Sequence, residues 1–413
     1  MSGEKILRRL VERNFLQTVI KTLDKILSLI TVRIMQCFIP IEQNKIVFIT
    51  FRGSYDCNPK WICEEIIRRN LPYQLVWIYR ANAISGAEDF PLKVKLVRRG
   101  SLDSFIELSS ARIIVDNGTN ISLEQYKKKR SQYLIETWHG SLGIKKFSPD
   151  AVKDKRWVKR TTIEGKMTNV CISNSTFEEN EVYRKTYWKT TDVWSYGHAR
   201  NDILFELNKE QTKRIKEKVF SSFDIPTGTK ICLYAPTFRD DHDLSPYTIN
   251  YKGLLKALKS RFGGEWVIMV RFHWHVQKLL EKFGGADGLL KDVIDAGIYP
   301  DIQELAVCTE VALTDYSSWI CEYMLTRRPG FLYVTDMEDY QKKDRPFFFP
   351  LETWPFPVAN SQDELEKNIL SFDNDLYVQR CNSFLQEMGC IDDGHAAERT
   401  VDEIIKIIQN KER

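Results

Sequence analysis

Short apolar runs alternate with helix-like stretches along most of this chain, and the alternation constrains its fold more than any other feature. An apolar run of three to five residues that precedes a longer amphipathic stretch is typical of a buried strand and the helix that covers it. Repeated in this order, the pattern predicts a parallel β-sheet with helices on both faces. The predicted strands are residues 46–50, 75–78, 112–115, 170–172, 231–235, 266–270, 311–314 and 331–334, and the helices predicted within the first series are 60–69 and 175–187.

The predicted strands fall into two series, separated by a charged segment at residues 205–229 that contains Pro226 and Gly228. A chain of 413 residues is long for a single hydrophobic core, so two domains are expected. We predict an α/β protein with two Rossmann-type domains and a cleft between them. The predicted boundaries are 1–40 for an N-terminal helical segment, 41–205 and 206–375 for the two domains, and 376–413 for C-terminal helices that pack back on the N-terminal domain.

The N-terminal segment has its own pattern. Between residues 5 and 39, apolar side chains recur at helical spacing, and Lys and Arg occupy much of the remaining surface. An amphipathic helix of this kind predicts contact with an anionic membrane surface. A packed helical hairpin or an oligomer contact would show the same pattern. Lys21, Asp24, Lys25 and Arg33 interrupt the apolar residues, so we do not expect this segment to span a membrane.

Charge and cysteine content exclude several classes of function. The net charge is only +4 and no long block of Lys and Arg accompanies it, so nucleic acid is not an expected partner. The 9 cysteines are scattered without a C-x-x-C pair, which excludes common zinc sites and favours a reducing compartment. The first residues also lack the apolar region of a signal peptide.

His139 lies in a Trp-His-Gly motif, and a further strand, in addition to those bounded above, is predicted just before it. Loops at the carboxyl ends of parallel strands line the ligand crevice of such sheets. A histidine with a pKa near neutrality takes a proton from an attacking hydroxyl, so His139 is a candidate general base. Gly140 lets the backbone turn sharply or approach a ligand closely. The alternative is a histidine that caps the next helix.

Arg271 and His273 lie just beyond the predicted strand 266–270 and alternate with apolar neighbours, so both are expected on the same side of the chain. A guanidinium beside an imidazole is suited to bind phosphate. His273 and His275 could also form half of a metal site. No acidic residue at metal-ligand spacing is nearby, and we therefore expect no metal.

Thr314, Ser317 and Ser318 follow the predicted strand 311–314 and precede an apolar helical stretch. Backbone N–H groups at such a turn, together with the partial positive charge of a helix N-terminus, favour an anion. The alternative is an ordinary serine N-cap.

Arg239 lies just beyond the predicted strand 231–235 and is another candidate phosphate ligand, because a guanidinium binds phosphate with two hydrogen bonds. It would otherwise pair with Asp240. Two Asp-x-Asp matches, at 241–243 and 373–375, are too short to indicate a metal site. No G-x-G-x-x-G, P-loop or serine-nucleophile motif is present, which argues against dinucleotide, ATP-hydrolysing and α/β-hydrolase chemistry.

Taken in order, several motifs resemble the CDP-glycerol glycerophosphotransferase family, which builds teichoic-acid and capsule polymers. The resemblance extends over about residues 45–400, and an ordered set of motifs is far more specific than any one of them. The similar segments are 57–60 (CNPK), 137–140 (TWHG), 197–202 (GHARND), 234–241 (YAPTFRDD), 271–273 (RFH), 299–301 (YPD), 313–318 (LTDYSS), 328–329 (RP) and 393–399 (DGHAAER).

The resemblance implies a GT-B-like fold, in which residues 41–205 hold an acceptor and residues 206–375 hold a CDP donor. It implies that an acceptor hydroxyl attacks the β-phosphorus of CDP-glycerol or CDP-ribitol and that CMP leaves. The acceptor would be lipid-linked or polymeric, and the protein would be peripheral on the cytoplasmic face of the plasma membrane. No cofactor and no divalent metal are implied.

The resemblance also implies roles for individual residues. His139 would be the general base, and His273 the second catalytic residue. The residues implied to hold the donor are Arg239, Arg271, Thr314, Ser317 and Ser318, with Asp301 and Glu304 near its hydroxyl groups. The residues implied on the acceptor side are Trp138, Gly140, Asn58 and Lys60.

The chain departs from the usual family pattern at three places. His198 stands where the family usually has proline, Ser141-Leu142 stands where Thr-Pro is common, and Glu322 stands where Asp is common. In the analogy, Ser141-Leu142 lies near the acceptor and His198 lies in the inter-domain loop, so an unusual acceptor or alditol is expected. A nucleotide-sugar glycosyltransferase of GT-B type, a CDP-ribitol ribitolphosphotransferase and a non-catalytic binding subunit remain alternatives.

Overall fold

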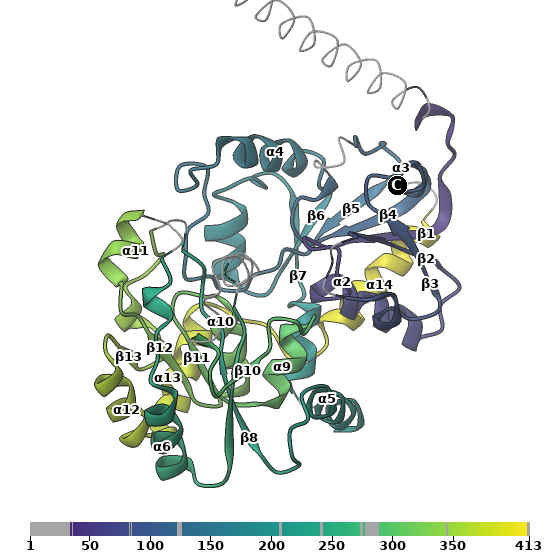
Figure 1. Ribbon diagram of the computed structural model, residues 1–413. Helices are drawn as coiled ribbons and strands as arrows, with labels where there is room; N and C mark the ends of the chain where they lie inside the picture. Colours follow the sequence, from purple (N-terminus) through teal and green to yellow (C-terminus); the bar gives the residue numbers. More distant parts are fainter. Residues whose placement is uncertain are drawn as a thin grey trace, which may run out of the picture.

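The computed structural model describes residues 34, 36–81, 83, 85–121, 126–205, 209–239, 243–272, 276, 289–343 and 346–410. The predictions made for residues 1–33 and for His273 therefore lie outside the described residues. Within the described residues, the chain forms two α/β domains, each built on one parallel sheet (Figure 1).

The first domain contains seven parallel strands, counted over the described residues. They are β1 (Glu42–Ile49), β2 (Gln74–Tyr79), β3 (Val94–Arg98), β4 (Ala111–Asp116), β5 (Tyr133–Glu136), β6 (Val170–Ser173) and β7 (Asp192–Ser195). Their order in the sheet is β3-β2-β1-β4-β5-β6-β7. Ile46 and Phe48 of β1 pack into one buried cluster, and Val47 and Ile49 pack into the cluster on the other face. Both faces are covered, so the central strands read as continuous apolar runs.

The second domain contains six parallel strands over the same described part of the chain. They are β8 (Lys230–Tyr234), β9 (Trp266–Val270), β10 (Ile294–Asp295), β11 (Thr309–Thr314), β12 (Gly330–Tyr333) and β13 (Val358–Ala359). Their order is β10-β9-β8-β11-β12-β13, so the longest strands again occupy the centre of the sheet. The two sheets confirm the predicted α/β fold.

Helices cover the sheets and connect the two domains. The α-helices are α2 (Cys57–Arg68), α3 (Leu102–Ser110), α4 (Lys155–Gly165), α5 (Lys209–Ser222), α6 (Tyr251–Phe262), α9 (Ile302–Cys308), α10 (Trp319–Tyr323), α11 (Met337–Lys343), α12 (Gln362–Leu370), α13 (Asn374–Glu387) and α14 (Ala396–Gln409). The shorter helical turns are η1 (Ala87–Asp89), η3 (Glu178–Tyr183), η4 (Ala199–Phe205), η5 (Ser245–Tyr247), η6 (Met324–Thr326) and η7 (Leu351–Thr353). In the described part of the chain, none of the helices combines the length and apolarity needed to cross a membrane.

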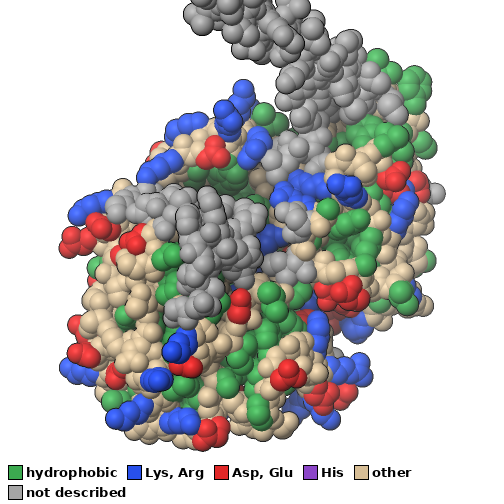
Figure 2. Space-filling model, in the orientation of Figure 1, with side chains coloured by type: hydrophobic (Ala, Val, Ile, Leu, Met, Phe, Trp, Pro, Cys, Tyr) green, Lys and Arg blue, Asp and Glu red, His purple; other side chains and the backbone are tan. Residues whose placement is uncertain are grey.

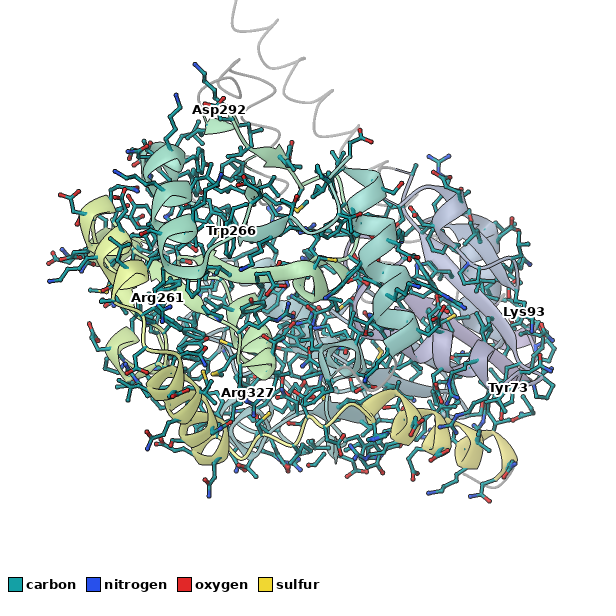
Figure 3. The ribbon with its side chains drawn as sticks, turned by 90° about the horizontal axis from the view of Figure 1, so that it is seen from below. Tyr73, Lys93, Arg261, Trp266, Asp292 and Arg327 are labelled. Carbon is teal, nitrogen blue, oxygen red and sulfur yellow. The ribbon has the colours of Figure 1, made fainter. Side chains whose placement is uncertain are left out.

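The last two helices lie on different domains. Phe384 of α13 packs on Trp354 of the second domain, with ring centroids 4.7 Å apart. The chain then crosses to the first domain, where the Asp202 carboxylate accepts hydrogen bonds from the first two backbone N–H groups of α14, at 3.0 and 2.8 Å. Figure 3 shows α14 on the side of Tyr73 and Lys93, while α12 and α13 lie on the side of Arg261 and Arg327. The segment between α13 and α14 therefore connects the second domain back to the first.

Candidate active site

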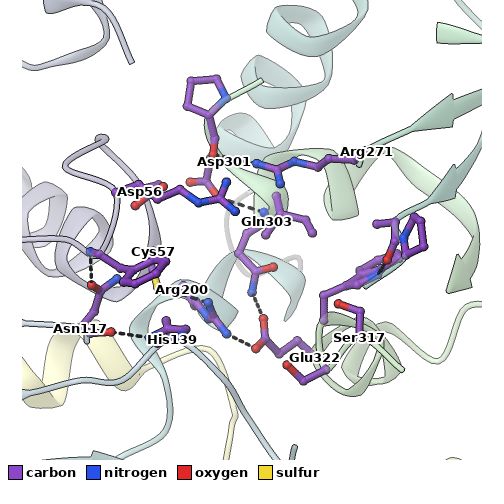
Figure 4. A pocket seen from close by; sticks show the side chains of 18 residues that line it. Asp56, Cys57, Asn117, His139, Arg200, Arg271, Asp301, Gln303, Ser317 and Glu322 are labelled. Carbon is purple, nitrogen blue, oxygen red and sulfur yellow. Dashed lines mark hydrogen bonds and ion pairs between the residues drawn. The ribbon is translucent and has the colours of Figure 1, made fainter. Parts of the chain in front are cut away.

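A cavity of about 280 Å³ lies between the two domains. Its walls come from the loops that follow β1, β4 and β5 in the first domain and β8, β9 and β11 in the second. The carboxyl ends of parallel strands from both sheets thus face one another, which is where ligands bind in folds of this class. Figure 4 shows side chains of both domains converging on this space. The polar and charged side chains that line the cavity include Arg52, Asp56, His139, Arg200, Arg271, Asp301, Ser317, Ser318 and Glu322.

His139 is exposed at the wall of this cavity and is held in one orientation. Its Nδ1 atom lies 2.6 Å from the backbone oxygen of Asn117. A carbonyl oxygen only accepts hydrogen bonds, so Nδ1 carries the proton and the neutral ring has its lone pair on Nε2. Phe51 stacks on the imidazole, with ring centroids 5.5 Å apart. The geometry therefore suits a general base whose tautomer is set by the backbone.

The loop that carries His139 is fixed by its neighbours. Trp138 has a positive φ of 52°, a conformation that is unfavourable for a residue with a side chain. It packs on Phe147, with ring centroids 5.0 Å apart. The Asn58 side-chain amide donates hydrogen bonds to the carbonyl oxygens of Thr137 and Trp138, at 2.9 and 3.2 Å. Asn58 therefore acts on the site through this loop, and it does not line the cavity.

A second cavity of about 280 Å³ adjoins the first. Trp138, Gly140 and Lys145 line it, and His139, Ser317 and Ser318 line both cavities. His139 and the two serines therefore stand at the boundary between two separate spaces.

Two arginines from different domains give the first cavity its positive charge. Arg271 follows β9, and its Nη2 donates to the carbonyl oxygens of Tyr299 and Pro300 at 3.0 and 3.1 Å. Its Nε is buried without a partner among the described residues. Burial and the nearby charge of Arg52 lower the pKa of Arg271 to about 10. Burial also lowers the pKa of Arg52, and the charge of Asp56 opposes this shift. An anion between the two guanidinium groups would offset the cost of burying their charges and the repulsion between them.

Asp56 titrates within this charged cavity. Burial raises its pKa to about 7, and the neighbouring charge of Asp301 adds to the shift. Arg52, Arg271 and Lys60 oppose the shift without cancelling it. The net charge of the cavity therefore changes near neutral pH.

Lys60, Asp301 and Glu304 form a buried ion-pair network across the domain interface. Lys60 Nζ of α2 lies 2.7 Å from Asp301 Oδ2 and 2.5 Å from Glu304 Oε1, beside α9. Burial by itself would raise the pKa of Glu304, but the charges of Lys60 and Lys218 outweigh it and lower that pKa to about 2. Asp301 lines the first cavity, whereas Lys60 and Glu304 lie behind it. The resemblance implied Lys60 on the acceptor side and Glu304 on the donor side, whereas in the structure the two side chains pair with each other.

Arg239 and Thr314 do not line either cavity. Arg239 lies 2.8 Å from Asp315 and 2.6 Å from Asp336, so two carboxylates already neutralise its guanidinium. The Thr314 hydroxyl donates to the carbonyl oxygen of Ala235 at 2.7 Å. Both side chains thus support the loops that present Ser317, because their polar atoms are satisfied within the protein.

Sequence reasoning missed four charged residues that line the cavity: Arg52, Asp56, Arg200 and Glu322. Arg52 and Asp56 follow β1, so the rule that singled out His139 after β5 would also have found them. Arg200 lies within a motif noted above, and it forms a buried ion pair with Glu322 that no local pattern indicates.

Comparison with known proteins identifies the family. The family model described as CDP-Glycerol:Poly(glycerophosphate) glycerophosphotransferase matches residues 31–406. A teichoic acid poly(glycerol phosphate) polymerase of Staphylococcus epidermidis is 27% identical over 390 residues, which cover 90% of this chain and 52% of that protein. One from Bacillus spizizenii is 27% identical over 385 residues, covering 89% of this chain and 93% of that protein. Ribitol-phosphate polymerases and primases are also similar to the chain.

A solved structure supports the same assignment. The wall teichoic acid polymerase TagF superposes with a TM-score of 0.78 at 25% identity, covering 97% of this chain and 99% of that one. The chain spans about half the length of the Staphylococcus epidermidis protein and nearly all of the Bacillus spizizenii protein. With its two-domain GT-B-like fold and the family match over most of its length, this chain belongs to the CDP-glycerol:poly(glycerophosphate) glycerophosphotransferase family.

Proposed function

We propose that this chain transfers glycerol phosphate from CDP-glycerol to a hydroxyl group of a polymeric or lipid-linked acceptor, with release of CMP. The observation that carries the proposal is His139, held with its proton on Nδ1, at the edge of a cavity that contains Arg52 and Arg271. Family membership supports a CDP-alditol as the donor. Glycerol is the better-supported alditol because three poly(glycerol phosphate) polymerases are 27% identical to the chain, whereas the ribitol-phosphate enzymes named above are 22–26% identical.

The proposed reaction needs little covalent chemistry from the protein. Nε2 of His139 takes the proton of the acceptor hydroxyl as its oxygen attacks the β-phosphorus. The new O–P bond forms while the bond between the β-phosphorus and the oxygen of CMP breaks, and CMP leaves with that electron pair. Arg52 and Arg271 would stabilise the negative charge on the phosphate oxygens during the transfer.

The two cavities supply separate places for two substrates. The first contains the arginines and suits the diphosphate of the donor. The second, lined by Trp138, Gly140 and Lys145, would receive the acceptor. An acceptor hydroxyl entering from the second cavity would meet the β-phosphorus beside His139, which lines both.

We propose that transfer proceeds without a cofactor or a divalent metal. The carboxylates of Asp301 and Glu322 at the cavity already have Lys60 and Arg200 as partners. The arginines supply the positive charge that a metal ion would otherwise bring to the phosphates. Turnover should therefore survive dialysis against a chelator, and recovery of activity only on adding Mg²⁺ or Mn²⁺ would contradict this.

We also propose that the protein works peripherally on the cytoplasmic face of the plasma membrane. The basic amphipathic pattern of residues 5–39 supports this, and the exposed Phe38 near its end adds an apolar contact. Lys155, Arg156 and Lys159 of α4 are exposed, and Figure 2 shows Lys and Arg side chains gathered over this helix. Anionic lipids would attract both regions.

Vesicle sedimentation tests the membrane proposal. Deleting residues 1–40 should release the protein from anionic vesicles while leaving CDP binding intact. Neutral vesicles serve as the control. Unchanged sedimentation of the shortened protein with anionic vesicles would contradict the proposal.

The function itself is tested with a panel of donors. Purified protein is incubated with CDP-glycerol, CDP-ribitol, UDP-glucose and UDP-N-acetylglucosamine, each with a glycerol-phosphate primer, and released nucleotide is measured. We expect CMP from CDP-glycerol. Release of CMP from CDP-ribitol alone would identify ribitol as the transferred alditol. Release of UDP would indicate a sugar transferase. No nucleotide release from any donor would favour a binding subunit.

A further inference from the structure

Three acidic side chains are buried together behind His139. Asp116 ends β4, Glu136 ends β5, and Glu164 lies near the end of α4. Their exposed fractions are 0%, 1% and 0%. One carboxyl oxygen from each lies within 4.8 Å of those from the other two. Three negative charges at this separation, away from water, would repel one another strongly, so their protonation has to be accounted for.

Hydrogen bonds identify Asp116 as an ionised member. Its Oδ1 accepts from the backbone N–H of Gly118 at 3.0 Å and from the Asn120 side-chain amide at 2.6 Å. Its Oδ2 accepts from the backbone N–H groups of Asn120 and Ile121, at 2.7 and 3.2 Å. Four N–H donors fill both oxygens, so this carboxyl group has no favourable place for a proton.

Glu136 has fewer donors than Asp116. Glu136 accepts one hydrogen bond on each oxygen, from the backbone N–H of Trp138 at 2.8 Å and from that of Thr119 at 3.2 Å. Glu164 accepts from the N–H of Ile121 at 3.3 Å. Burial, followed by the charges of Asp116 and Glu164, raises the pKa of Glu136 well above its ordinary value.

Two more titratable groups face Glu136 from neighbouring elements. They are Cys171 of β6 and Tyr183 of η3. Burial raises the pKa of both side chains well above the ordinary range, so both are uncharged near neutral pH.

The cluster holds both loops that set the position of His139. Asp116 organises residues 117–121, and the carbonyl oxygen of Asn117 in that loop receives the Nδ1 proton of His139. Glu136 holds the backbone N–H of Trp138, the residue with positive φ directly before His139. Displacing either carboxyl group would therefore move the base or its hydrogen-bond partner.

We propose that Asp116, Glu136 and Glu164 form a carboxyl cluster that positions His139, with Asp116 ionised and Glu136 protonated. All three are positioning residues, because none of them lines either cavity. The proposal extends the proposed function, since it assumes that His139 is the base. The structural part, a protonated Glu136 and a fixed imidazole tautomer, is measurable without turnover.

Two spectroscopic measurements test that structural part. Infrared spectra of the full chain at pH 8 should show the carbonyl stretch of a buried protonated carboxyl group, and the band should disappear in Glu136→Gln. NMR of ¹⁵N-labelled histidine should show the Nδ1–H tautomer for His139, assigned with His139→Ala. The tautomer should persist in Glu136→Gln and be lost in Asp116→Asn.

Kinetics separate positioning from general destabilisation. Glu136→Gln keeps an oxygen for the N–H of Trp138 and a donor for the cluster, so it should retain most of the wild-type kcat. Glu136→Leu and Asp116→Asn remove these contacts and should lower kcat by about 10- to 100-fold, with little change in the donor KM. Val76→Ala, a core truncation in the same domain, is the control for lost stability and should keep its kcat.

Three results would contradict the proposed cluster. The proposal fails if the infrared band is absent, if Glu136→Gln loses as much kcat as Glu136→Leu, or if metal analysis finds a stoichiometric cation that Glu136→Gln releases. If no donor is turned over but the band and the tautomer are observed, the proposed function fails and the cluster stands.

Discussion

At the scale of single residues, the site depends on groups whose hydrogen bonds leave them only one role. His139 is the simplest case, because the Asn117 carbonyl accepts from Nδ1 and the lone pair is on Nε2. His139→Ala should lower kcat at least about 10²-fold, the usual contribution of a positioned base. CDP binding and the Tm should change little, since His139 is exposed. His395→Ala, which removes another exposed histidine, is the matched control. An unchanged rate of CMP release in His139→Ala would exclude His139 as the base.

Arg52 has the clearest role in binding. A charge-assisted hydrogen bond contributes about 1.5–3 kcal/mol, so Arg52→Ala should weaken donor binding by roughly 10- to 100-fold. Arg52→Lys should recover part of this loss because it keeps the charge. Isothermal titration with CDP measures the effect, and Arg98→Ala, an exposed arginine of β3, is the control. Equal affinities for wild type and Arg52→Ala would place the diphosphate elsewhere.

Asp56 makes folding and binding depend on pH. Its pKa is raised from 3.8 to about 7, so between these values the folded state binds more protons than the unfolded state. The stability from this raised pKa is complete below 3.8 and is lost as the pH rises towards 7. Asp56→Asn should therefore be more stable than wild type at pH 8, with the difference shrinking at pH 5, as urea unfolding would show.

The same variant predicts a change in anion binding. Without the Asp56 carboxylate, CDP should bind more tightly at pH 8, and the dependence of its affinity on pH should flatten. A stability difference that is the same at pH 5 and pH 8 would contradict the assignment.

At the scale of secondary-structure elements, α2 connects the site to the second domain. Its first turn carries Asn58, which holds the Trp138 carbonyl, and Lys60, which pairs with Asp301 and Glu304 beside α9. The η4 segment continues this contact, because its Arg200 pairs with Glu322 of α10. The two domains thus contact each other through buried ion pairs where their interface borders the cavity.

Removing Lys60 tests the interface. Lys60→Met removes the ion-pair partner of the buried Asp301 carboxylate and leaves the Glu304 carboxylate with only Lys218, so the free energy of unfolding should fall by about 3–5 kcal/mol. The lowered pKa of Glu304 stabilises the fold above its ordinary value of 4.5, and this contribution is lost as the pH falls through about 2. Lys60→Met should therefore also reduce the loss of stability in acid.

Two controls accompany this measurement. Lys60→Met combined with Asp301→Asn and Glu304→Gln should recover part of the stability, because no uncompensated charge is left buried. Lys213→Ala, which breaks an exposed ion pair on α5, should cost at most about 1 kcal/mol. If Lys60→Met costs no more than Lys213→Ala, the network does not stabilise the interface.

At the scale of the whole molecule, the active site exists only where both domains meet. Arg52 and His139 come from the first sheet, Arg271 and Ser317 come from the second, and α14 returns the chain to the first domain. CDP at 100 times its Kd should therefore stabilise the protein by about 2.7 kcal/mol, within one cooperative thermal transition. Differential scanning calorimetry measures this, with cytidine as the control lacking phosphates. A shift confined to one of two separate transitions would indicate a site within one domain.

Much of the architecture followed from local patterns in the sequence. Apolar runs located β9 at its observed bounds and found the centres of β1, β2, β4, β6, β8, β11 and β12, because strands buried on both faces are apolar throughout. The strands that were not predicted have shorter or interrupted apolar runs. β7 is a partly exposed edge strand, β10 and β13 are two residues long, and polar residues interrupt β3.

The sequence by itself thus determined the fold class, the family motifs and His139 as the leading candidate for the base, since each depends on residues close together in the chain. Which charged side chains contact one another was determined only by the tertiary structure. It paired Lys60 with Asp301 and Glu304, 241 and 244 residues away, and gave Arg239 two carboxylate partners outside the cavity. It also brought Arg52 to face Arg271 and gathered three carboxyl groups behind His139. Charge interactions act through space and leave no periodicity in the sequence, so only the packing of the two domains reveals them.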